Sequence, residues 1–357
     1  MYNNYEPYYS ALEGYNRSSY LSADEDAKSK MIDDVFKIYR DVNEYPTPKF
    51  TDEDARIEVI KCYSKKVDTQ TEFMNLKFNQ GGALCRHFFP NLRDTIQAGD
   101  PRTLNAKFFD DHMLKRAIEF CLKFKTTKYP VKPSGIKDGL EMLGGGVATN
   151  FKPMSAKWVY DKYCREGGTV YDFSSGFGGR MLGAASSHNV AKYIGTDPNT
   201  VTFSNQEKLS SIIRSALPDF RLCLHNLPSE ELQLSNKSVD LAFSSPPYFD
   251  LEVYTDESTQ SVAKFPDYTN WLDGYVRPTL CNIRNALKRD GILALNVADY
   301  KYKNRTQYVV DDWISIAKSE GLNHIDTIPM RIQTRRGVGH GCNAKEKQEG
   351  IYIFSTN

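Results

Sequence analysis

From residue 150 to the C-terminus, short apolar runs alternate with segments of helical periodicity. Runs such as TVYDF and KYIGTD have the length and composition of buried strands, and each precedes a segment whose apolar residues recur three and four positions apart. A helix-sized crossover is what joins one parallel strand to the next, so this alternation is typical of parallel sheets. The pattern predicts an α/β fold with a doubly wound, mostly parallel sheet and with ligands at the carboxyl ends of its strands.

The predicted strands and helices can be read from the sequence. The expected strands are TVYDF, KYIGTD, RLCLHN, VDLAFSS, ILALNVAD, HIDTIPMRI and GIYIFS. The expected helices are SAKWVYDKYC, GRMLGAASSH, VTFSNQEKLSSIIRSAL, TNWLDGYVRPTLCNIRNALKRDG and QYVVDDWISIAKSEG, the fourth of them kinked or interrupted at Pro278.

The chain before residue 150 is mainly helical. AKSKMIDDVFKIYRDV and FFDDHMLKRAIEFCLKFK show amphipathic spacing, and Thr51 followed by three acids predicts a helix start. We predict a tyrosine-rich arm over 1–20, either loosely ordered or docked, a mainly helical region over 21–148, and a catalytic domain over 149–357. The basic, aromatic stretch CLKFKTTKYPVK is either a solvated helix end followed by a linker or a contact to nucleic acid. The N-terminal region is also where we expect a homodimer or partner-protein contact.

The composition argues against several classes of protein, namely membrane-spanning, secreted, zinc-binding and disulfide-bonded ones. With 40% hydrophobic and 25% charged residues the chain is typical of globular proteins, and no run approaches the eighteen apolar residues of a membrane span. The N-terminus lacks a secretory pattern. The seven cysteines form no C-x-x-C pair, which argues against zinc and disulfides. We therefore expect a cytoplasmic protein with no metal and no membrane contact.

A glycine-rich turn follows the first strand of this region. In DFSSGFGGRMLG, Gly176, Gly178 and Gly179 let the backbone approach a ligand and let the next helix pack tightly on the sheet. The following strand ends in Asp197, where an acid can accept two hydrogen bonds from ribose hydroxyls. A cap for the helix after Pro198 is the alternative role for Asp197.

The most unusual stretch is FSSPPYFDLE, at the end of VDLAF. Two consecutive prolines fix φ twice and remove two backbone donors, so the strand must stop and the chain must turn in an extended conformation. Ser245, the carbonyl of Pro246 and the ring of Tyr248 are thereby held stiffly at the edge of the sheet.

In their order and spacing, DFSSGFGG, GTDPN, SSPPYF and ALKRDGILALNV resemble a class I S-adenosylmethionine-dependent methyltransferase. Within that superfamily the Ser-Pro-Pro-Tyr corner is similar to that of the DNA amino-methyltransferases, which act on N4 of cytosine or N6 of adenine. The resemblance covers about the last two hundred residues and implies a seven-stranded Rossmann-like sheet that binds S-adenosyl-L-methionine.

The resemblance also implies roles for particular residues. The cofactor-binding set would be Phe151, Pro153, Asp172, Ser174, Gly176, Gly178, Gly179 and Asp197, together with an acid-like residue after the third strand, for which Asn226 and Glu230 are both candidates. The chain departs from the family in having no recognisable target-recognition domain after the last strand.

The corner would act as an amine clamp. Ser245 Oγ and the Pro246 carbonyl would each accept one amino hydrogen, with Pro246 and Pro247 keeping these acceptors in place and Tyr248 stacking on a flipped-out base of double-stranded DNA. Phe249 and Tyr254 would assist or pack. Arg335 and Arg336, with Lys345 and Lys347, would contact DNA phosphate or remain solvated. In the family that the motif resembles, serine at the first position of the Ser-Pro-Pro-Tyr motif favours N4 of cytosine over N6 of adenine as the methylated atom.

The leading hypothesis is therefore a DNA amino-methyltransferase, alone or in a restriction-modification or phage system. Methylation of an RNA base or a protein amide is a second hypothesis, because planar amides and amines suit the same corner. A nucleic-acid-binding protein that keeps the fold without catalysis is the third.

Overall fold

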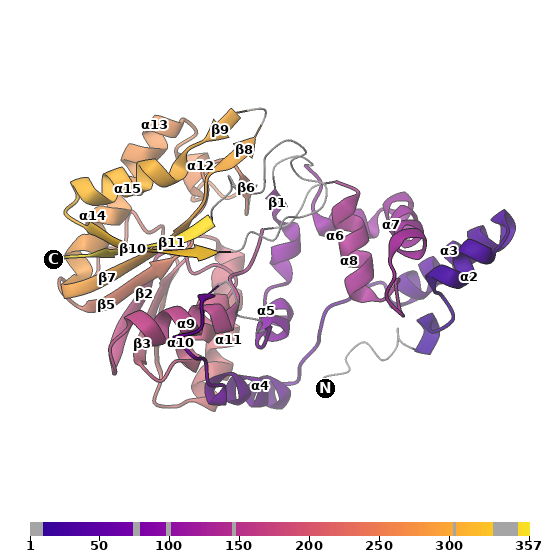
Figure 1. The fold of residues 1–357 in the computed structure, drawn as a ribbon, viewed down its shortest axis with the longest axis horizontal. Coiled ribbons are helices and arrows are strands. Elements are labelled where there is room, and N and C mark those ends of the chain that lie inside the picture. The colour runs from indigo at the N-terminus through magenta and orange to yellow at the C-terminus, as the bar shows by residue number, and fades with distance from the viewer. Residues whose placement is uncertain (1–9, 74–78, 98–100, 145–147, 303–304, 331–348) are drawn as a thin grey trace. The chain divides into compact units, whose positions relative to one another are not determined.

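The computed structural model describes residues 10–73, 79–97, 101–144, 148–302, 305–330 and 349–357 (Figure 1). The chain forms two compact units, one of residues 1–50 and 90–148 and one of residues 51–89 and 149–357. The segment 51–89 thus belongs to the second unit. The three domains predicted from the sequence, with boundaries after residues 20 and 148, remain a prediction.

The first unit is built from helices around one apolar core. Its elements are α2 (Arg17–Ser22), α3 (Glu25–Val42), the 3₁₀-helix η2 (Pro90–Asp94), the short strand β1 (Ile96–Gln97), α6 (Leu104–Phe109), α7 (Asp111–Phe124) and α8 (Pro133–Met142). Tyr20, in the predicted arm, is buried in this core. The single helix predicted over 108–125 is wrong, because Asp110 ends α6 and caps α7 by accepting a hydrogen bond from Met113 N at 2.9 Å.

The second unit contains the sheet. Its strands are β2 (Gly168–Asp172), β3 (Val190–Thr196), β4 (Arg221–His225), β5 (Val239–Ser244), β6 (Glu252–Val253), β7 (Leu287–Val297), β8 (Tyr300–Tyr302), β9 (Arg305–Gln307), β10 (Asn323–Met330) and β11 (Glu349–Ser355). Its helices are α4 (Asp52–Ser64), α5 (Gly82–Phe88), α9 (Pro153–Tyr163), α10 (Gly179–Ser186), α11 (Thr200–Ala216), α12 (Ser261–Lys264), α13 (Tyr268–Trp271), the π-helix η3 (Leu272–Val276), α14 (Arg277–Ala286) and α15 (Val309–Ser319). Thr51 caps α4 as predicted.

Seven strands form the main sheet, in the order β10-β11-β7-β5-β2-β3-β4. The five from β7 to β4 are parallel, whereas β11 runs antiparallel to β7 and β10 antiparallel to β11. Helices α9, α10 and α11 lie on one face and α13, α14 and α15 on the other (Figure 1). The predicted fold class, a doubly wound and mostly parallel seven-stranded sheet preceded by a mainly helical region, is confirmed.

The order of the strands creates one switch point. From β2 the chain moves outward through β3 to β4, then returns to pair β5 with the other side of β2 and continues outward to β7. Ligands of open α/β sheets bind in the crevice at the carboxyl ends of the strands on either side of such a point. Here those strand ends are Asp172 on β2 and Ser244 on β5.

The long helix predicted over 269–291 is divided. A π-helix, η3, precedes α14, and Pro278 lies in the first turn of α14, where its missing N–H is tolerated. The helix changes from π to α at Arg277, and Val276 and Arg277 both keep helical backbone angles, so the predicted kink or interruption at Pro278 stays a prediction. The predicted end at Gly291 is wrong. Leu287 already pairs with Val239 as the first residue of β7, so pairing with β5 outweighs helical propensity.

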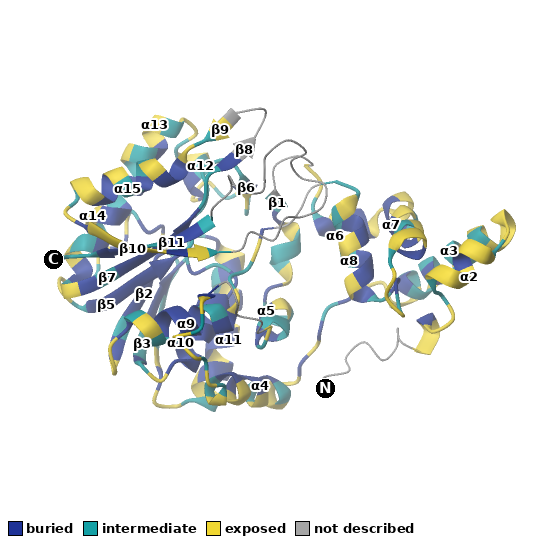
Figure 2. Cartoon of the chain, in the orientation of Figure 1, coloured by how far each residue is buried: buried dark blue, intermediate teal, exposed yellow. Residues whose placement is uncertain are grey.

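The interior strands are buried on both faces, as Figure 2 shows for β5, all of whose residues are buried. Near-continuous apolar strands of this kind belong to parallel sheets covered by helices. In the described part of the chain, no helix has the length and apolar character needed to cross a membrane.

Ile353→Ala should destabilise the sheet unit by about 2–5 kcal/mol, since it empties a fully buried site on β11. Ile325→Ala on the neighbouring β10 is the matched control, because Ile325 is 56% exposed, and its loss should stay under about 1 kcal/mol. Urea unfolding followed by tryptophan fluorescence is the measurement, since all three tryptophans lie in this unit. Equal losses would contradict the assignment of the core.

Candidate functional site

The glycine turn and the Ser-Pro-Pro-Tyr corner meet at the switch point. The turn follows β2 and the corner follows β5, and the two strands pair in parallel through Val170 with Leu241 and Tyr171 with Ala242. Because the carboxyl ends of parallel neighbours reach the same edge of a sheet, two motifs seventy residues apart in the sequence lie side by side.

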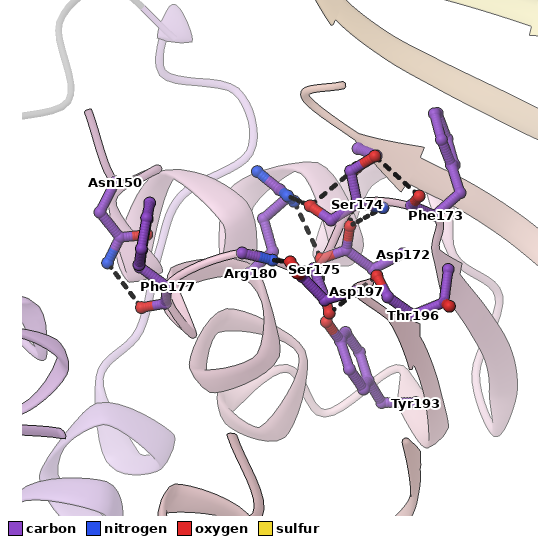
Figure 3. Close-up of polar contacts among 12 residues, drawn as sticks. Asn150, Asp172, Phe173, Ser174, Ser175, Phe177, Arg180, Tyr193, Thr196 and Asp197 are labelled. Atoms are coloured by element: carbon purple, nitrogen blue, oxygen red, sulfur yellow. Dashed lines mark hydrogen bonds and ion pairs between the residues drawn. The ribbon is translucent and has the colours of Figure 1, made fainter. Parts of the chain in front are cut away.

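The glycines are required by the backbone and by close packing. Gly176 and Gly178 have φ of +54° and +76°, a region that side chains rarely tolerate. A Cβ at Gly179 would lie 1.8 Å from the carbonyl oxygen of Phe151, so the segment before α9 can cross the turn only because residue 179 has no side chain. Asn150 Nδ2 also donates to the Phe177 carbonyl at 2.9 Å, which ties the two segments together (Figure 3).

Asp197 closes the turn from the end of β3. Its carboxylate accepts hydrogen bonds from Gly176 N at 2.9 Å and from Asn199 N at 3.0 Å. Burial raises the pKa of Asp197 to about 6, against the lowering effect of these N–H groups. The capping alternative is wrong, because the side chain of Asn199 is the N-cap of α11. The predicted ribose contact of Asp197 remains a prediction.

The structure places Asn226 and Glu230, the two candidates for the cofactor-binding position after β4, in different surroundings. Asn226 Nδ2 donates to the carbonyls of Asp197 and Pro198 at 2.9 and 3.1 Å, so its side chain borders the Asp197 loop. Glu230 instead pairs with Lys264 at 2.9 Å, and its buried Oε2 has no hydrogen-bond partner among the residues that the structure describes. Burial raises the pKa of Glu230. Asn226 is thus the candidate that lies against the predicted cofactor acid.

A buried ionic network joins the turn to the corner. Asp172 is fully buried, and its carboxylate accepts bonds from Arg180 Nε at 2.9 Å, Tyr193 OH at 2.8 Å and Ser244 Oγ at 2.8 Å. Arg180 also donates to the carbonyl of Ser174, as the convergence of these side chains in Figure 3 shows. The carboxylate of Asp172 is therefore engaged by the protein, and its predicted cofactor contact remains a prediction.

Sequence reasoning missed Arg180, Tyr193 and Ser244. An arginine inside the otherwise small and apolar helix GRMLGAAS is the one signal that could have pointed to a buried ion pair, because a buried guanidinium needs a partner. The pairing of Ser244 with Asp172 depends on which strands are neighbours, and no local pattern encodes that.

The corner is partly buried and its backbone is constrained. Pro246 is buried, Ser245 Oγ lies 3.5 Å from Tyr248 OH, and Phe249 adopts a φ of +43°. Burial, followed by the charge of Glu349, holds the pKa of Tyr248 well above its ordinary value. Tyr248 is therefore a neutral phenol beside Ser245 at physiological pH.

The other predicted site residues divide into two groups. Phe151 packs its ring against Phe243 at 5.3 Å between centroids, and Tyr254 lies 6.3 Å from Phe177 in the glycine turn, so both border the site. Pro153 is buried in the first turn of α9, and Phe249 packs on Tyr268 and Trp271. The predicted contacts Arg335, Arg336, Lys345 and Lys347 lie outside the described residues.

No family model and no curated protein matches this chain. Several solved structures resemble part of it. A TehB-like SAM-dependent methyltransferase from Corynebacterium glutamicum is 17% identical, with 59% of this chain and 90% of that chain covered at a TM-score of 0.36. A geranyl diphosphate C-methyltransferase from Streptomyces coelicolor A3(2) is 11% identical, with 57% and 78% covered at a TM-score of 0.41. At these scores neither likeness assigns an activity, and the fold rests on the strand order above.

Arg180→Met should cost the sheet unit about 3–5 kcal/mol, because it leaves the buried carboxylate of Asp172 without its cation. Arg277→Met is the control, since Arg277 pairs with Glu320 at 2.9 Å at the surface and such pairs contribute under about 1 kcal/mol. Urea midpoints by tryptophan fluorescence measure both. A loss for Arg180→Met no larger than for Arg277→Met would remove the network from the account.

Proposed function

We propose that this chain is an S-adenosylmethionine-dependent methyltransferase that methylates an exocyclic amino nitrogen of a base in double-stranded DNA. The observation that carries the proposal is the placement of the glycine turn and the Ser-Pro-Pro-Tyr corner on the two sides of one switch point, joined by the bond from Ser244 to Asp172. A site for a nucleoside-bearing ligand and a clamp for an amine are thereby neighbours.

The residues of the turn fit the cofactor. A carboxylate offers about four acceptor positions, and two of those of Asp197 are used by Gly176 and Asn199, which leaves acceptors for ribose hydroxyls. Asn226, bonded to the same loop through its Nδ2, presents its amide beside that acid. Phe151, Ser174 and the glycines would complete the site, and the bound cofactor would supply an activated methyl group on a sulfonium.

The corner would prepare the amine for attack. An exocyclic amine is a poor nucleophile because its lone pair is delocalised into the ring. Ser245 Oγ and the Pro246 carbonyl would each accept one of its hydrogens, which turns the lone pair out of the ring plane. Buried Pro246 and strained Phe249 prevent these acceptors from relaxing away, so the geometry exists before the base arrives. The half-buried Tyr248 would present part of its ring to the base.

We also propose which base and which nucleic acid the chain methylates, namely cytosine in DNA. Serine at the first position of the corner favours N4 of cytosine over N6 of adenine, and the base would leave the duplex at a cost of a few kcal/mol. In the first unit, Lys123 and Phe124 at the end of α7 are exposed, and we propose that this basic, aromatic end contacts DNA. Methylation of RNA or of a protein amide is the alternative outcome of the test.

Ser245→Ala should lower kcat about 10²-fold or more while leaving the dissociation constant of the cofactor within about twofold, because Ser245 Oγ would bond the amine and Tyr248 rather than the cofactor. Pro246→Ala should act in the same direction. Ser258→Ala and Pro266→Ala, at exposed positions of the same unit, are the matched controls. The assay supplies methyl-deuterated cofactor to separate DNA, tRNA and protein pools and digests the nucleic acids for mass spectrometry of nucleosides. Deuterium found only in RNA or protein would refute the DNA assignment.

Cofactor affinity should fall as the pH drops through about 6, since Asp197 then becomes protonated and loses charge-assisted acceptors. Above pH 7 the affinity should be constant. Calorimetric titration of S-adenosylhomocysteine between pH 5 and 8 measures it, with Asp197→Asn expected to bind more weakly and without that pH dependence. An unchanged pH profile in Asp197→Asn would exclude a contact of Asp197 with the cofactor.

A further inference from the structure

A row of polar residues continues from the corner along the carboxyl edge of the sheet. Ser244 pairs with Leu295, so Ser245 comes beside Asn296, and Asn296 pairs with Ile351 of β11. Side chains alternate along a strand, so Glu349, two residues before Ile351, lies on the same face as Ile351 and Asn296. The bond from Asn296 Nδ2 to Glu349 Oε1, at 3.4 Å, agrees with this placement.

The carboxylate of Glu349 differs from the other acids around the corner. Asp250 accepts a bond from Tyr300 OH at 2.7 Å, Glu252 accepts one from Tyr254 OH, and Asp299 accepts one from Val310 N at 3.0 Å. Each of these three carboxylates therefore already accepts a hydrogen bond from a protein donor.

Glu349 is held more weakly, because its bond from Asn296 Nδ2 is long, at 3.4 Å. The two N–H groups of that amide also have the Gly350 carbonyl at 3.1 Å and Met330 Sδ at 3.2 Å as acceptors. Burial raises the pKa of Glu349, and the bond from Asn296 opposes that effect. Its charge in turn acts on Tyr248, the residue whose hydroxyl lies beside Ser245. Glu349 is therefore a weakly engaged carboxylate of raised pKa, bonded to Asn296 on the strand next to the corner.

Amine methylation releases a proton that such a group can accept. When the amine nitrogen forms its bond to the methyl carbon, the carbon–sulfur bond breaks with its electrons on sulfur, and the nitrogen is left with one proton too many. Ser245 Oγ and the Pro246 carbonyl can accept hydrogen bonds but cannot hold that proton near neutral pH. A carboxylate within reach of the amine can.

We propose that Glu349 is the proton acceptor of the transfer, with Asn296 positioning its carboxylate. The proposal rests on the proposed function, since it concerns the amine held at Ser245. Ser245 Oγ takes the proton that the methylated nitrogen releases while its own hydroxyl proton leaves towards Glu349. The serine thus ends neutral, and the proton on Glu349 then passes to solvent.

The test compares pH profiles of kcat at saturating cofactor and DNA for the wild type, Glu349→Gln, Glu349→Asp and Glu252→Gln. Glu252→Gln is the matched control, because Glu252 is a second carboxylate whose charge reaches Tyr248 but is bonded to Tyr254. Saturating cofactor removes the contribution of Asp197 to binding, and Tyr248 stays neutral throughout the range.

In the wild type, kcat should rise with pH along a limb above the ordinary glutamate value of about 4.3, because only the carboxylate accepts a proton and burial raises its pKa. Glu349→Gln should lose that limb and about 10²-fold or more in kcat, with the KM for DNA within about twofold. Glu349→Asp should keep the limb with reduced kcat, and Glu252→Gln should keep both.

A Glu349→Gln enzyme that retains the wild-type limb, or a Glu252→Gln enzyme that alone loses it, would overturn the assignment while leaving the proposed function standing. Wild-type protein that transfers no methyl group to any amine would overturn the proposed function and this inference with it. The urea midpoint of Glu349→Gln checks the fold, and a midpoint equal to that of the wild type makes a lost limb a chemical effect.

Discussion

The candidate site depends on one buried carboxylate. Asp172 lies at the end of β2 without solvent contact, and it is neutralised by Arg180 and bonded by Tyr193 and Ser244. Arg180 comes from the helix after the glycine turn and Ser244 from the strand before the corner, so one anion fixes both loops. An ion of this kind is costly to bury, and removing either partner would leave the other uncompensated.

Rigidity continues outward from that anion on both sides. On one side, Gly179 allows the carbonyl of Phe151 to cross the turn, and Asp197 bonds to Gly176 from the next strand. On the other side, Pro246 and Pro247 stop β5 and hold Ser245 and Tyr248 at the sheet edge. Few groups of the site would have to rearrange when ligands bind, which is the condition under which fixed acceptors lower a barrier most.

Much of this was predictable from the sequence. Periodicity predicted the seven strands of the main sheet and the helices on its two faces, but not the short elements α5, β6, α12, β8 and β9. Glycine spacing marked the turn and two prolines marked the corner, because each of these is a local property of the chain. The two errors differ in origin. Asp110 divides a helix whose apolar pattern continues through it, which is a local effect, whereas Leu287 leaves its helix because it pairs with Val239 on another strand. The ion pair of Arg180, the bond of Ser244 and the bond between Asn296 and Glu349 depend on which strands are neighbours. That order is a tertiary property, and no spacing in the sequence encodes it.

The central claim is that the turn after β2 and the corner after β5 are two halves of one methyl-transfer site. A crystal structure of the complex with S-adenosylhomocysteine and a DNA duplex tests it most directly. We predict ribose hydroxyls on Asp197, the thioether sulfur directed across the switch point, and an extruded base whose amino group lies within hydrogen-bond distance of Ser245 Oγ and the Pro246 carbonyl. A ligand bound away from the glycine turn, or a base whose amine does not reach the corner, would contradict the account.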